Sequence, residues 1–478
     1  MADRAIQDIT ALVERLAGTG VLCVGDIMLD RFVHGSVTRV SPEAPIPVLR
    51  VEGETEMLGG VGNVARNAAS LGAKATLLSA VGDDDPGRRI QSMIEAEPHI
   101  SATLAVEPRR QTTVKTRYLS EAQQLLRADR ETTAALSDAG VRRIEAAFDV
   151  AVAEHDAVVL SDYAKGVLDD RLLRHLIDAS TVAGKPIVAD PKSTNFERYR
   201  GVTLLTPNRA ELSAASGMDC RDDDDITAAA AEWVERAGVG AVLVTRGNQG
   251  MTLVAGRGEA VHLATDAREV FDVSGAGDTV VATLAAALGA GADLADAARA
   301  ANLAGGVAVA KAGTATVYPD ELVHAFHADE LRSADDKICA LQPALDRIMR
   351  WRRAGDRIGF TNGCFDLVHP GHISLLNQAR AACDRLVVGL NTDASVKRLK
   401  GASRPIQNEH ARAAVLAAFG AVDMVIVFSD DTPLQIIDGI RPDVLIKGAD
   451  YTIDQVVGRD LVEGYGGRIL LADLEPGH

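Results

Sequence analysis

The sequence predicts an α/β protein with two domains, of which the first has a large parallel sheet and a small β flap and the second is smaller. Three observations support this prediction. Short apolar runs alternate with longer helix-like segments, a stretch of alternating polar and apolar residues interrupts them, and the rhythm restarts after a charged region. Continuous apolar runs are typical of strands buried on both faces, as in a parallel sheet covered by helices.

In the first domain, five apolar runs are expected strands of the sheet and one segment is an expected helix. They are Val21–Val24, Ala157–Leu160, Pro186–Ala189, Thr203–Leu205, Ala241–Val244 and the helix-like Ile226–Ala237. From Val37 to Met57, and again from Thr103 to Leu126, polar and apolar residues alternate, as in strands with one face in water. These two stretches predict a flap that could cover a substrate.

A polar, helix-prone stretch from Pro319 to Gly355 separates this region from a second set of apolar runs. These runs are Arg357–Thr361, Arg385–Leu390, Asp423–Phe428, Asp443–Ile446 and Arg468–Leu471. A chain of 478 residues is longer than one hydrophobic core usually serves. We therefore expect domains at residues 1–318 and 356–478, joined by a linker at 319–355.

Composition and charge exclude several classes of protein. Hydrophobic residues at 47% and charged residues at 24% are ordinary for a globular fold, and a net charge of −17 disfavours binding to nucleic acid or to an anionic membrane. The apolar stretch Thr279–Ala292 is too short to span a bilayer, and Met1–Gly18 lacks a signal-peptide pattern. Five widely spaced cysteines without a CxxC pair argue against disulfides and zinc. We expect a cytoplasmic protein.

The first candidate site is the segment Asp272–Asp278, which leads into an alanine-rich helix. Gly275 and Gly277 let backbone amides turn toward a ligand, and the start of a helix attracts negative charge. Asp278 could then accept the proton of an attacking hydroxyl while the amides hold a phosphoryl group. A glycine turn followed by an aspartate that merely caps the helix is the alternative interpretation.

Other polar groups follow predicted strands, where open α/β sheets bind ligands. Asn208 and Glu211 are spaced to organise magnesium through water beside ATP, while Ser161–Gly166 and Asp190–Lys192 follow neighbouring strands. Each alone could equally be a loop polar group or a helix cap. The glycines of Gly59–Gly62 half-match a dinucleotide fingerprint, but they follow the flap instead of the first core strand, so we reject that interpretation.

Together, four segments resemble the ribokinase-like pfkB family of sugar kinases over residues 15–315. These segments are Gly25–Asp30, Gly59–Asn67, Asn208–Glu211 and Gly275–Asp278. The resemblance implies Asp278 as general base and Gly275, Ala276 and Gly277 as the anion hole. It also implies an ATP and magnesium element formed by Asn208, Arg209, Ala210 and Glu211, and sugar contacts from Asp30, Gly59, Gly60, Asn63 and Asn67. The Thr-Val-Val-Ala run after Asp278 departs from the aromatic and glycine often found there, which concerns helix packing more than chemistry.

The second candidate site is the string from Phe360 to His372, which follows an apolar run and opens a helix. His369 and His372 lie at this turn, where two imidazoles can donate hydrogen bonds to phosphates. The alternative is a Pro-Gly turn with two exposed histidines. A zinc site is disfavoured because no third histidine or carboxylate completes a ligand set.

The same string resembles the HxGH nucleotidyltransferases of the cytidylyltransferase-like superfamily, which have a Rossmann-like fold. The resemblance implies His369 and His372 as catalytic residues and ATP contacts from Thr361, Asn362, Gly363, Phe365, Lys400, Lys447 and Gly448. In this superfamily a Ser/Thr-rich segment opens a final helix, whereas this sequence ends Glu475-Pro-Gly-His478. An active transferase and an inactive nucleotide-binding module therefore both remain open.

The fused order resembles the bifunctional heptose 7-phosphate kinases/heptose 1-phosphate adenylyltransferases of bacterial lipopolysaccharide precursor synthesis, to which Thr38–Val48 and Phe196–Gly201 look specific. The resemblance implies that the first domain uses ATP and Mg²⁺ to phosphorylate heptose 7-phosphate at C1. A separate phosphatase then removes the 7-phosphate, and the second domain makes ADP-heptose and pyrophosphate from heptose 1-phosphate and ATP.

We expect the 7-phosphate to be bound by cations near the flap, with Arg117, Lys165 and Lys192 as candidates. The free edges of the projecting flap favour a homodimer. A kinase for another phosphosugar fused to a cytidylyltransferase is an open alternative, because these motifs do not reveal the base.

Overall fold

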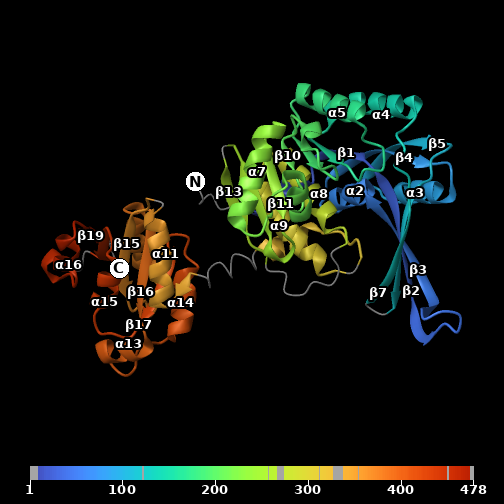
Figure 1. The fold of residues 1–478 in the computed structure, drawn as a ribbon. Helices are drawn as coiled ribbons and strands as arrows, with labels where there is room; N and C mark the ends of the chain where they lie inside the picture. Colours follow the sequence, from blue (N-terminus) through green and yellow to red (C-terminus); the bar gives the residue numbers. More distant parts are fainter. Residues whose placement is uncertain are drawn as a thin grey trace. The chain divides into compact units, whose positions relative to one another are not determined.

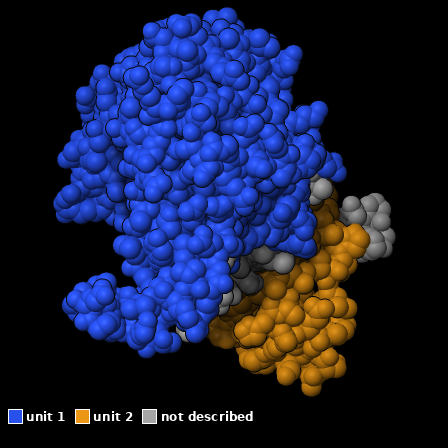
Figure 2. All heavy atoms as spheres, turned by 90° about the vertical axis from the view of Figure 1, so that its right-hand side faces the viewer, with its two compact units in different colours: residues 1–326 blue, residues 327–478 orange. Residues whose placement is uncertain are grey.

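The computed structural model describes residues 9–120, 123–256, 258–265, 274–311, 313–326, 337–353, 355–448 and 452–473. The chain divides into two compact units, residues 1–326 and residues 327–478, which Figure 2 shows in blue and orange. Each unit has its own sheet and its own apolar core. The predicted α/β fold with a larger and a smaller domain is confirmed.

Unit 1 is built on a nine-stranded sheet of order β13-β12-β11-β10-β9-β8-β1-β4-β5. Neighbours from β11 to β5 run parallel, and β12 and β13 add an antiparallel edge. The strands are β1 (Gly20–Gly25), β4 (Lys74–Gly82), β5 (Ile100–Glu107), β8 (Ala157–Ser161), β9 (Ile187–Asp190), β10 (Leu204–Leu205), β11 (Ala241–Thr245), β12 (Met251–Ala255) and β13 (Glu259–Leu263). All five runs expected in this sheet form strands, because their uninterrupted apolar side chains are buried on both faces.

Helices cover both faces of this sheet (Figure 1). One face is packed by α1 (Ile9–Leu16), α2 (Val61–Ser70), α3 (Asp85–Glu95), α8 (Ala276–Gly289) and α9 (Leu294–Val309). The other is packed by α4 (Asp138–Ala151), α5 (Asp170–Val182), α6 (Arg209–Ser216) and α7 (Asp223–Ala237). Helix α8 is buried along most of its length, which its alanines allow because small side chains let neighbouring elements approach closely.

A four-stranded sheet projects from unit 1 as the predicted flap (Figure 1). Its order is β3-β2-β6-β7, with β2 at Ile27–Val40, β3 at Pro47–Gly60, β6 at Thr113–Ser120 and β7 at Gln123–Arg130. The predicted start of its second part was wrong, because residues 103–107 pair with β4 in the main sheet as part of β5. Polar and apolar residues alternate there because one face of this edge strand contacts solvent.

Unit 2 has a parallel six-stranded sheet of order β14-β17-β16-β15-β18-β19. Its strands are β14 (Ile338–Cys339), β15 (Ile358–Gly363), β16 (Arg385–Asn391), β17 (Met424–Phe428), β18 (Val444–Gly448) and β19 (Arg468–Ala472). Its helices are α11 (Leu341–Arg353), α12 (Pro370–Ala381), α13 (Asp393–Lys400), α14 (Glu409–Ala417), α15 (Leu434–Ile440) and α16 (Arg459–Gly464).

Helix α11 lies inside the stretch expected as a linker, and its Ala344 and Ile348 are buried in the core of unit 2. Its apolar positions at intervals of three and four residues form the packing face. No helix in the described part of the chain combines the length and the apolarity needed to cross a bilayer.

Candidate active sites

In unit 1, helix α8 begins at a glycine turn. Gly275 is the N-cap with a φ of 78°, and a Cβ there would lie 2.7 Å from Asn63 Nδ2, so a side chain would be both strained and crowded. The first amides of the helix, at Ala276, Gly277 and Asp278, have no acceptor one turn earlier and carry the positive end of the helix dipole. The turn is thus built to bind an anion.

The Asp278 carboxylate lies in this first turn and is 4% exposed. Its Oδ2 accepts a hydrogen bond from Asn63 Nδ2 at 2.8 Å, and its Oδ1 accepts one from the Tyr163 hydroxyl at 2.8 Å. The helix cap is Gly275, which makes no side-chain cap bond, so Asp278 is not the capping residue. Burial raises the pKa of Asp278 to about 6, although both donors act to lower it.

Two asparagines of α2 support this carboxylate. Asn67 Nδ2 donates to the Asn63 backbone oxygen at 3.0 Å, and its Oδ1 accepts from Thr279 Oγ1 at 2.9 Å. Both asparagines are fully buried. The structure therefore places Asn63 at the Asp278 carboxylate and Asn67 behind it, between α2 and α8, whereas we expected both to face sugar hydroxyls.

The root of the flap carries the other expected sugar contacts. Arg117 Nη1 donates to Asp30 Oδ1 at 2.5 Å, and its guanidinium lies 5.1 Å from the centroid of the Phe32 ring. A Cβ at Gly59 would lie 2.2 Å from Asp30 Oδ2, and one at Gly60 would lie 2.3 Å from the Asp26 carbonyl oxygen. These glycines let β3 pass close to Asp30, whose orientation is fixed by Arg117.

Asn208 and Glu211 form a capping box at the start of α6. Asn208 Oδ1 accepts from the Glu211 amide at 2.9 Å, and Glu211 Oε2 accepts from the Asn208 amide at 2.9 Å. Glu211 Oε1 is also paired with Lys192. Burial, with the nearby charges of Glu211 and Asp278, raises the pKa of Asp190 to about 7. Among the described residues, no group of three or more His, Cys, Asp or Glu side chains could hold a metal ion directly, and Lys192 is the cation that pairs with Glu211.

The remaining members of the expected ATP element lie beside this box. Arg209 Nη1 donates to Gln249 Oε1 at 3.1 Å, and Ala210 is exposed. Asn208 also bridges to Thr245 at the end of β11, which connects the capping box to the neighbouring cavity.

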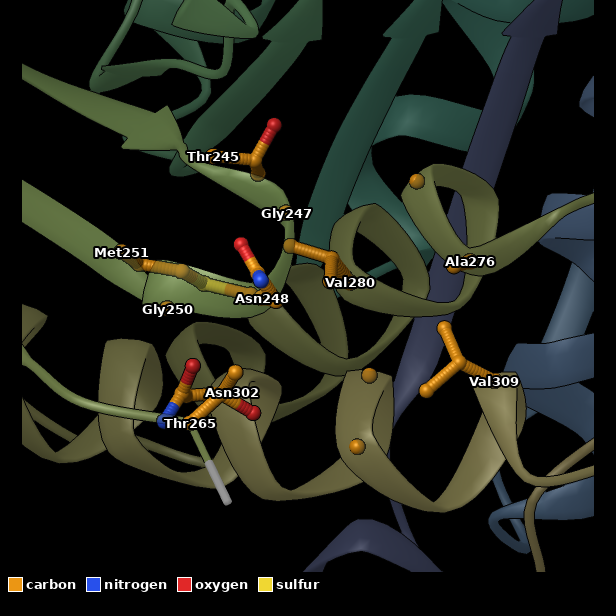
Figure 3. Close-up of a pocket in the computed structure, with 13 residues that line it drawn as sticks. Thr245, Gly247, Asn248, Gly250, Met251, Thr265, Ala276, Val280, Asn302 and Val309 are labelled. Carbon is orange, nitrogen blue, oxygen red and sulfur yellow. The ribbon is translucent and has the colours of Figure 1, made fainter. Parts of the chain in front are cut away.

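That cavity, of about 180 Å³, opens beside the start of α8 (Figure 3). Its walls come from Thr245 and Asn248, from Val280 of α8, and from Asn302 and Val309 of α9. Asn302 Nδ2 donates to the Ala264 carbonyl at 2.7 Å, but its buried Oδ1 has no hydrogen-bond partner in the part of the chain that the structure describes. A mostly apolar cavity with an unused acceptor suits a nucleotide base, and Ala276 and Gly277 on its wall place the anion-binding turn next to it.

In unit 2, the two histidines of the second motif lie at the start of α12. His369 is the N-cap residue, and the His369 and His372 ring centroids are 3.9 Å apart. Burial, with smaller contributions from the charges of His369 and Lys400, lowers the pKa of His372 to about 4. His372 Nδ1 is buried and has no hydrogen-bond partner among the described residues. A neutral imidazole with an unused ring nitrogen is thus available to a ligand.

The strand before this turn carries the expected nucleotide contacts. Lys447 Nζ, from β18, donates to Asn362 Oδ1 at 2.7 Å, and no described residue forms a hydrogen bond with the buried Thr361 Oγ1. Phe365, with a φ of 43°, stacks its ring 5.0 Å from that of His372. Gly363 and Gly448 end β15 and β18. The carboxyl ends of the parallel strands β15 and β18 thus bring these residues to the histidines.

Arg412 organises the loops of unit 2. It is 1% exposed and donates from Nη1 to the Cys364 carbonyl at 2.5 Å and from Nη2 to Asp393 Oδ1 at 2.7 Å. Arg404 Nη1 donates to Asp366 Oδ2 at 2.6 Å. These two arginines therefore hold the loop that follows β15 in place, through Cys364 and Asp366. Residues 449–451 and 474–478, which complete the expected loop and terminus, lie outside the described residues.

Tyr163, Asp190 and Asp26 lie in the segments Ser161–Gly166, Asp190–Lys192 and Gly25–Asp30, which we expected near the ligand without a role for these three side chains. Asp26 accepts hydrogen bonds from the amides of Tyr163, Lys165 and Val167, which shapes the loop after β8 and brings the Tyr163 hydroxyl to Asp278. In the sequence, these residues stand out only because they follow apolar runs. Their contacts could not be predicted, because they join parts of the chain more than 100 residues apart.

The chain matches two family models, "pfkB family carbohydrate kinase" over residues 19–321 and "Cytidylyltransferase-like" over residues 360–476. Curated relatives match nearly the whole chain. The "Bifunctional protein HldE" of Paramagnetospirillum magneticum is 53% identical over 98% of this chain and 97% of its own length, and that of Caulobacter sp. strain K31 is 55% identical over 98% and 95%. The chain belongs to the HldE family. Like other members of the HldE family it combines a sugar kinase with a nucleotidyltransferase, which confirms both expected enzyme classes.

Solved structures share the fold of the kinase half. Escherichia coli phosphofructokinase-2 in complex with substrates and products is 23% identical, with a TM-score of 0.55, covering 65% of this chain and 98% of that one. Arabidopsis thaliana ribokinase, solved with ribose and ATP, is 20% identical, with a TM-score of 0.51, covering 64% and 98%. These similarities establish that the kinase unit of this HldE-family chain has the ribokinase-like fold.

Proposed function

We propose that unit 1 phosphorylates the C1 hydroxyl of heptose 7-phosphate with ATP, and that unit 2 transfers AMP from a second ATP to heptose 1-phosphate. The products are heptose 1,7-bisphosphate, and then ADP-heptose and pyrophosphate, for lipopolysaccharide core precursor synthesis. The observation that carries the proposal is the presence, in one chain, of a buried base at an anion-binding helix start and of a paired-histidine turn. The full-length similarity to the HldE family supports the pairing of these reactions.

In the kinase step, Asp278 accepts the proton of the C1 hydroxyl as the hydroxyl oxygen attacks the γ-phosphorus of ATP and ADP leaves. Asn63 and Tyr163 hold the carboxylate in place for this transfer. The amides at the start of α8 stabilise the charge on the transferred phosphoryl group. Asp30, oriented by Arg117, is positioned to bind a sugar hydroxyl.

We propose that Mg²⁺ bound with ATP is held through water by Glu211 and Asn208, with Asp190 beside them. The cation would neutralise charge on the phosphates when bound. The pKa of Asp190 is raised mainly by burial and further by the charges of Glu211 and Asp278, and a divalent cation would offset those charges. Lys192 lies among these carboxylates, so we propose it as a phosphate contact of ATP in preference to the sugar 7-phosphate.

In the transferase step, an oxygen of heptose 1-phosphate attacks the α-phosphorus of ATP and pyrophosphate leaves. His369 and His372 donate hydrogen bonds to the phosphates, and Lys400 and Lys447 add positive charge at the same site. Thr361, Asn362 and the turn at Phe365 line the approach of the nucleotide, the first through its unused hydroxyl.

Mass spectrometry of the products tests the proposal directly. With heptose 7-phosphate and ATP, the chain should form only the bisphosphate, and an added heptose bisphosphate phosphatase should allow ADP-heptose to appear. Heptose 1-phosphate offered with each nucleoside triphosphate in turn should react with ATP in preference to CTP. Formation of CDP-heptose, or no reaction in the second step, would contradict the assignment to unit 2.

The acid side of the kinase pH profile should follow Asp278. The pKa of Asp278 is raised to about 6, and the base works only when ionised, so kcat/KM should fall as pH decreases through 6. At pH 5 only about a tenth of the carboxylate would be ionised. Initial rates between pH 5 and 8, at saturating ATP, measure this profile, and a flat profile down to pH 5 would contradict the role of Asp278.

Replacing Tyr163 with phenylalanine should move this profile. The hydroxyl of Tyr163 donates to Asp278 and acts to lower its pKa, so the Y163F variant should lose activity at a higher pH than the wild type. The expected shift is about half a pH unit to one unit, as for loss of one hydrogen bond to a carboxylate. A purely structural role would lower the rate equally at all pH values.

We also propose that the chain forms a homodimer in the cytoplasm. The flap exposes apolar side chains that a partner flap could cover: Val40 is 64% exposed, Ile46 57%, Val51 51% and Leu126 59%. All five cysteines are free thiols, as expected in a reducing compartment. Light scattering of the purified chain tests the dimer.

A further inference from the structure

A cluster of two lysines and two carboxylates lies where the flap meets the loop after β8. Lys115 Nζ of β6 lies 3.2 Å from Asp129 Oδ2 and 3.7 Å from Glu131 Oε2, and Lys165 Nζ lies 2.9 Å from Glu131 Oε1. The side chains of Lys115 and Lys165 are only 14% and 16% exposed, while Glu131 is 33% exposed. One carboxylate, Glu131, is therefore shared by two largely buried ammonium groups.

The strand register places this cluster on the face of the flap that looks toward the kinase site. Lys115 pairs with Asp30 on β2, and Asp30 pairs with Met57 on β3, so the three side chains share one face. Met57 Sδ accepts a hydrogen bond from Thr314 Oγ1 at 3.0 Å. Thr314 in turn borders the turn at Gly275, so this face adjoins the start of α8.

The loop after β8 links the Asp278 carboxylate to the cluster of lysines and carboxylates. Its Tyr163 donates to the catalytic carboxylate, and Lys165, two residues later, reaches Glu131. The amides of Tyr163 and Lys165 both donate to Asp26 Oδ2, at 2.9 and 3.0 Å, so these two residues start close together. Lys115 lies one strand, or about 5 Å, beyond Asp30. A sugar with its C1 hydroxyl at Asp278 and another hydroxyl at Asp30 would therefore direct its far end toward Lys115 and Lys165.

We propose that Lys115 and Lys165 bind the phosphate at the far end of the sugar substrate, and that this phosphate takes the place of Glu131. Glu131 acts as a resident counter-ion that keeps the two ammonium groups together before substrate binds. A phosphomonoester carries close to two negative charges at neutral pH. When Glu131 moves away, Lys115 keeps its ion pair with Asp129, so the phosphate meets the ammonium group of Lys165 and the remaining N–H donors of Lys115. Lys115 thereby joins Lys165 as a determinant of preference for a phosphorylated sugar.

This inference deepens the proposed function and depends on it. It also predicts that the lysine variants and the glutamate variant differ in how they change the KM for the sugar phosphate. K115Q and K165Q should each raise the KM for heptose 7-phosphate by roughly 10-fold or more with kcat little changed, since each loses a charge-assisted contact. E131Q should lower that KM or leave it unchanged, because the phosphate no longer competes with a carboxylate.

Steady-state kinase assays with heptose 7-phosphate measure these effects, with nucleotidyl transfer followed on the same samples. R50Q is the matched control, because Arg50 is a flap cation that is 76% exposed and lies outside the cluster, and its KM should equal that of the wild type. K115R should restore most of the affinity. The inference is overturned if K115Q and K165Q keep the wild-type KM, or if E131Q raises it as the lysine variants do. If the wild type itself leaves heptose 7-phosphate unphosphorylated, the proposed function fails instead.

Discussion

Replacing Asp278 with asparagine is expected to abolish phosphorylation and to leave nucleotidyl transfer at the wild-type rate. The amide cannot take the proton of the C1 hydroxyl, and loss of a general base typically costs roughly 10² to 10⁴ in rate. Helix α8 should be preserved, because its cap is Gly275 and the asparagine oxygen can still accept from Asn63. The transferase site lies in a separate compact unit and does not use this residue.

The same variant should not be less stable at neutral pH. Burial raises the pKa of Asp278 to about 6, so the stability that its protonated form contributes is present below the unfolded pKa near 4 and is lost as the pH rises through 6. At pH 7 to 8 the folded protein therefore carries an unfavourable buried charge that asparagine removes. Thermal unfolding at pH 8 should give a melting temperature equal to or above that of the wild type.

A suitable control is D293N. Asp293 is the N-cap of α9, and its Oδ1 accepts from the Asp296 amide at 2.8 Å, a bond that an asparagine oxygen can also accept. This variant therefore tests what the negative charge of an aspartate at a helix start contributes. It should lower the melting temperature slightly and leave both activities intact. Retention of kinase activity in D278N, or loss of both activities in a folded D278N sample, would contradict the two-site account.

Local patterns in the sequence were sufficient to predict the core strands. The runs at Val21–Val24 and Ala241–Val244 are apolar at each position because both faces of the sheet are covered by helices. The start of the flap was harder to predict, since β2 begins at Ile27 with residues buried on both faces and only later alternates. Residues 103–107 alternate as well, but as an edge of the main sheet. The alternation of polar and apolar residues shows which face of a strand contacts water, but it does not show which sheet the strand joins.

The glycine turns were also predictable, because few residues other than glycine adopt the backbone conformation found at Gly275. The roles of polar side chains were less so. Asn208 and Glu211 have the spacing of a capping box, and the structure shows that box together with the ion pair to Lys192. The spacing alone did not reveal that ion pair, because Lys192 belongs to another loop.

Groups brought together only by the tertiary fold could not be found from the sequence. Tyr163 lies 115 residues from Asp278, and Lys115 lies 50 residues from Lys165, with Glu131 between them. None of these contacts follows a helical or strand period. The position of Asp278 at the start of a glycine-capped helix was therefore predictable from one motif, whereas the side chains that contact it required the structure.

Replacing His372 with alanine is expected to abolish nucleotidyl transfer and to spare phosphorylation. The ring is largely neutral at working pH, since burial lowers its pKa to about 4, and its partner-free Nδ1 shows that this polar group is not needed to satisfy the fold. Loss of a hydrogen-bond donor to the reacting phosphates costs roughly 10² to 10³ in rate. The kinase reaction of the same sample should be unchanged, because unit 1 contributes its own base and its own anion-binding turn.

The control for this variant is H410A, because His410 is an exposed histidine on α14 of the same unit and should be replaceable without effect. ATP binding to H372A separates catalysis from binding. If the histidine acts on the transition state, ATP should still bind while turnover is lost. If the unit were an inactive nucleotide-binding module, the wild type would show no turnover of heptose 1-phosphate for this substitution to remove. The partial burial of His372 favours the catalytic outcome, because its ring packs against Phe365 and is not an exposed turn residue, whereas His369 is exposed.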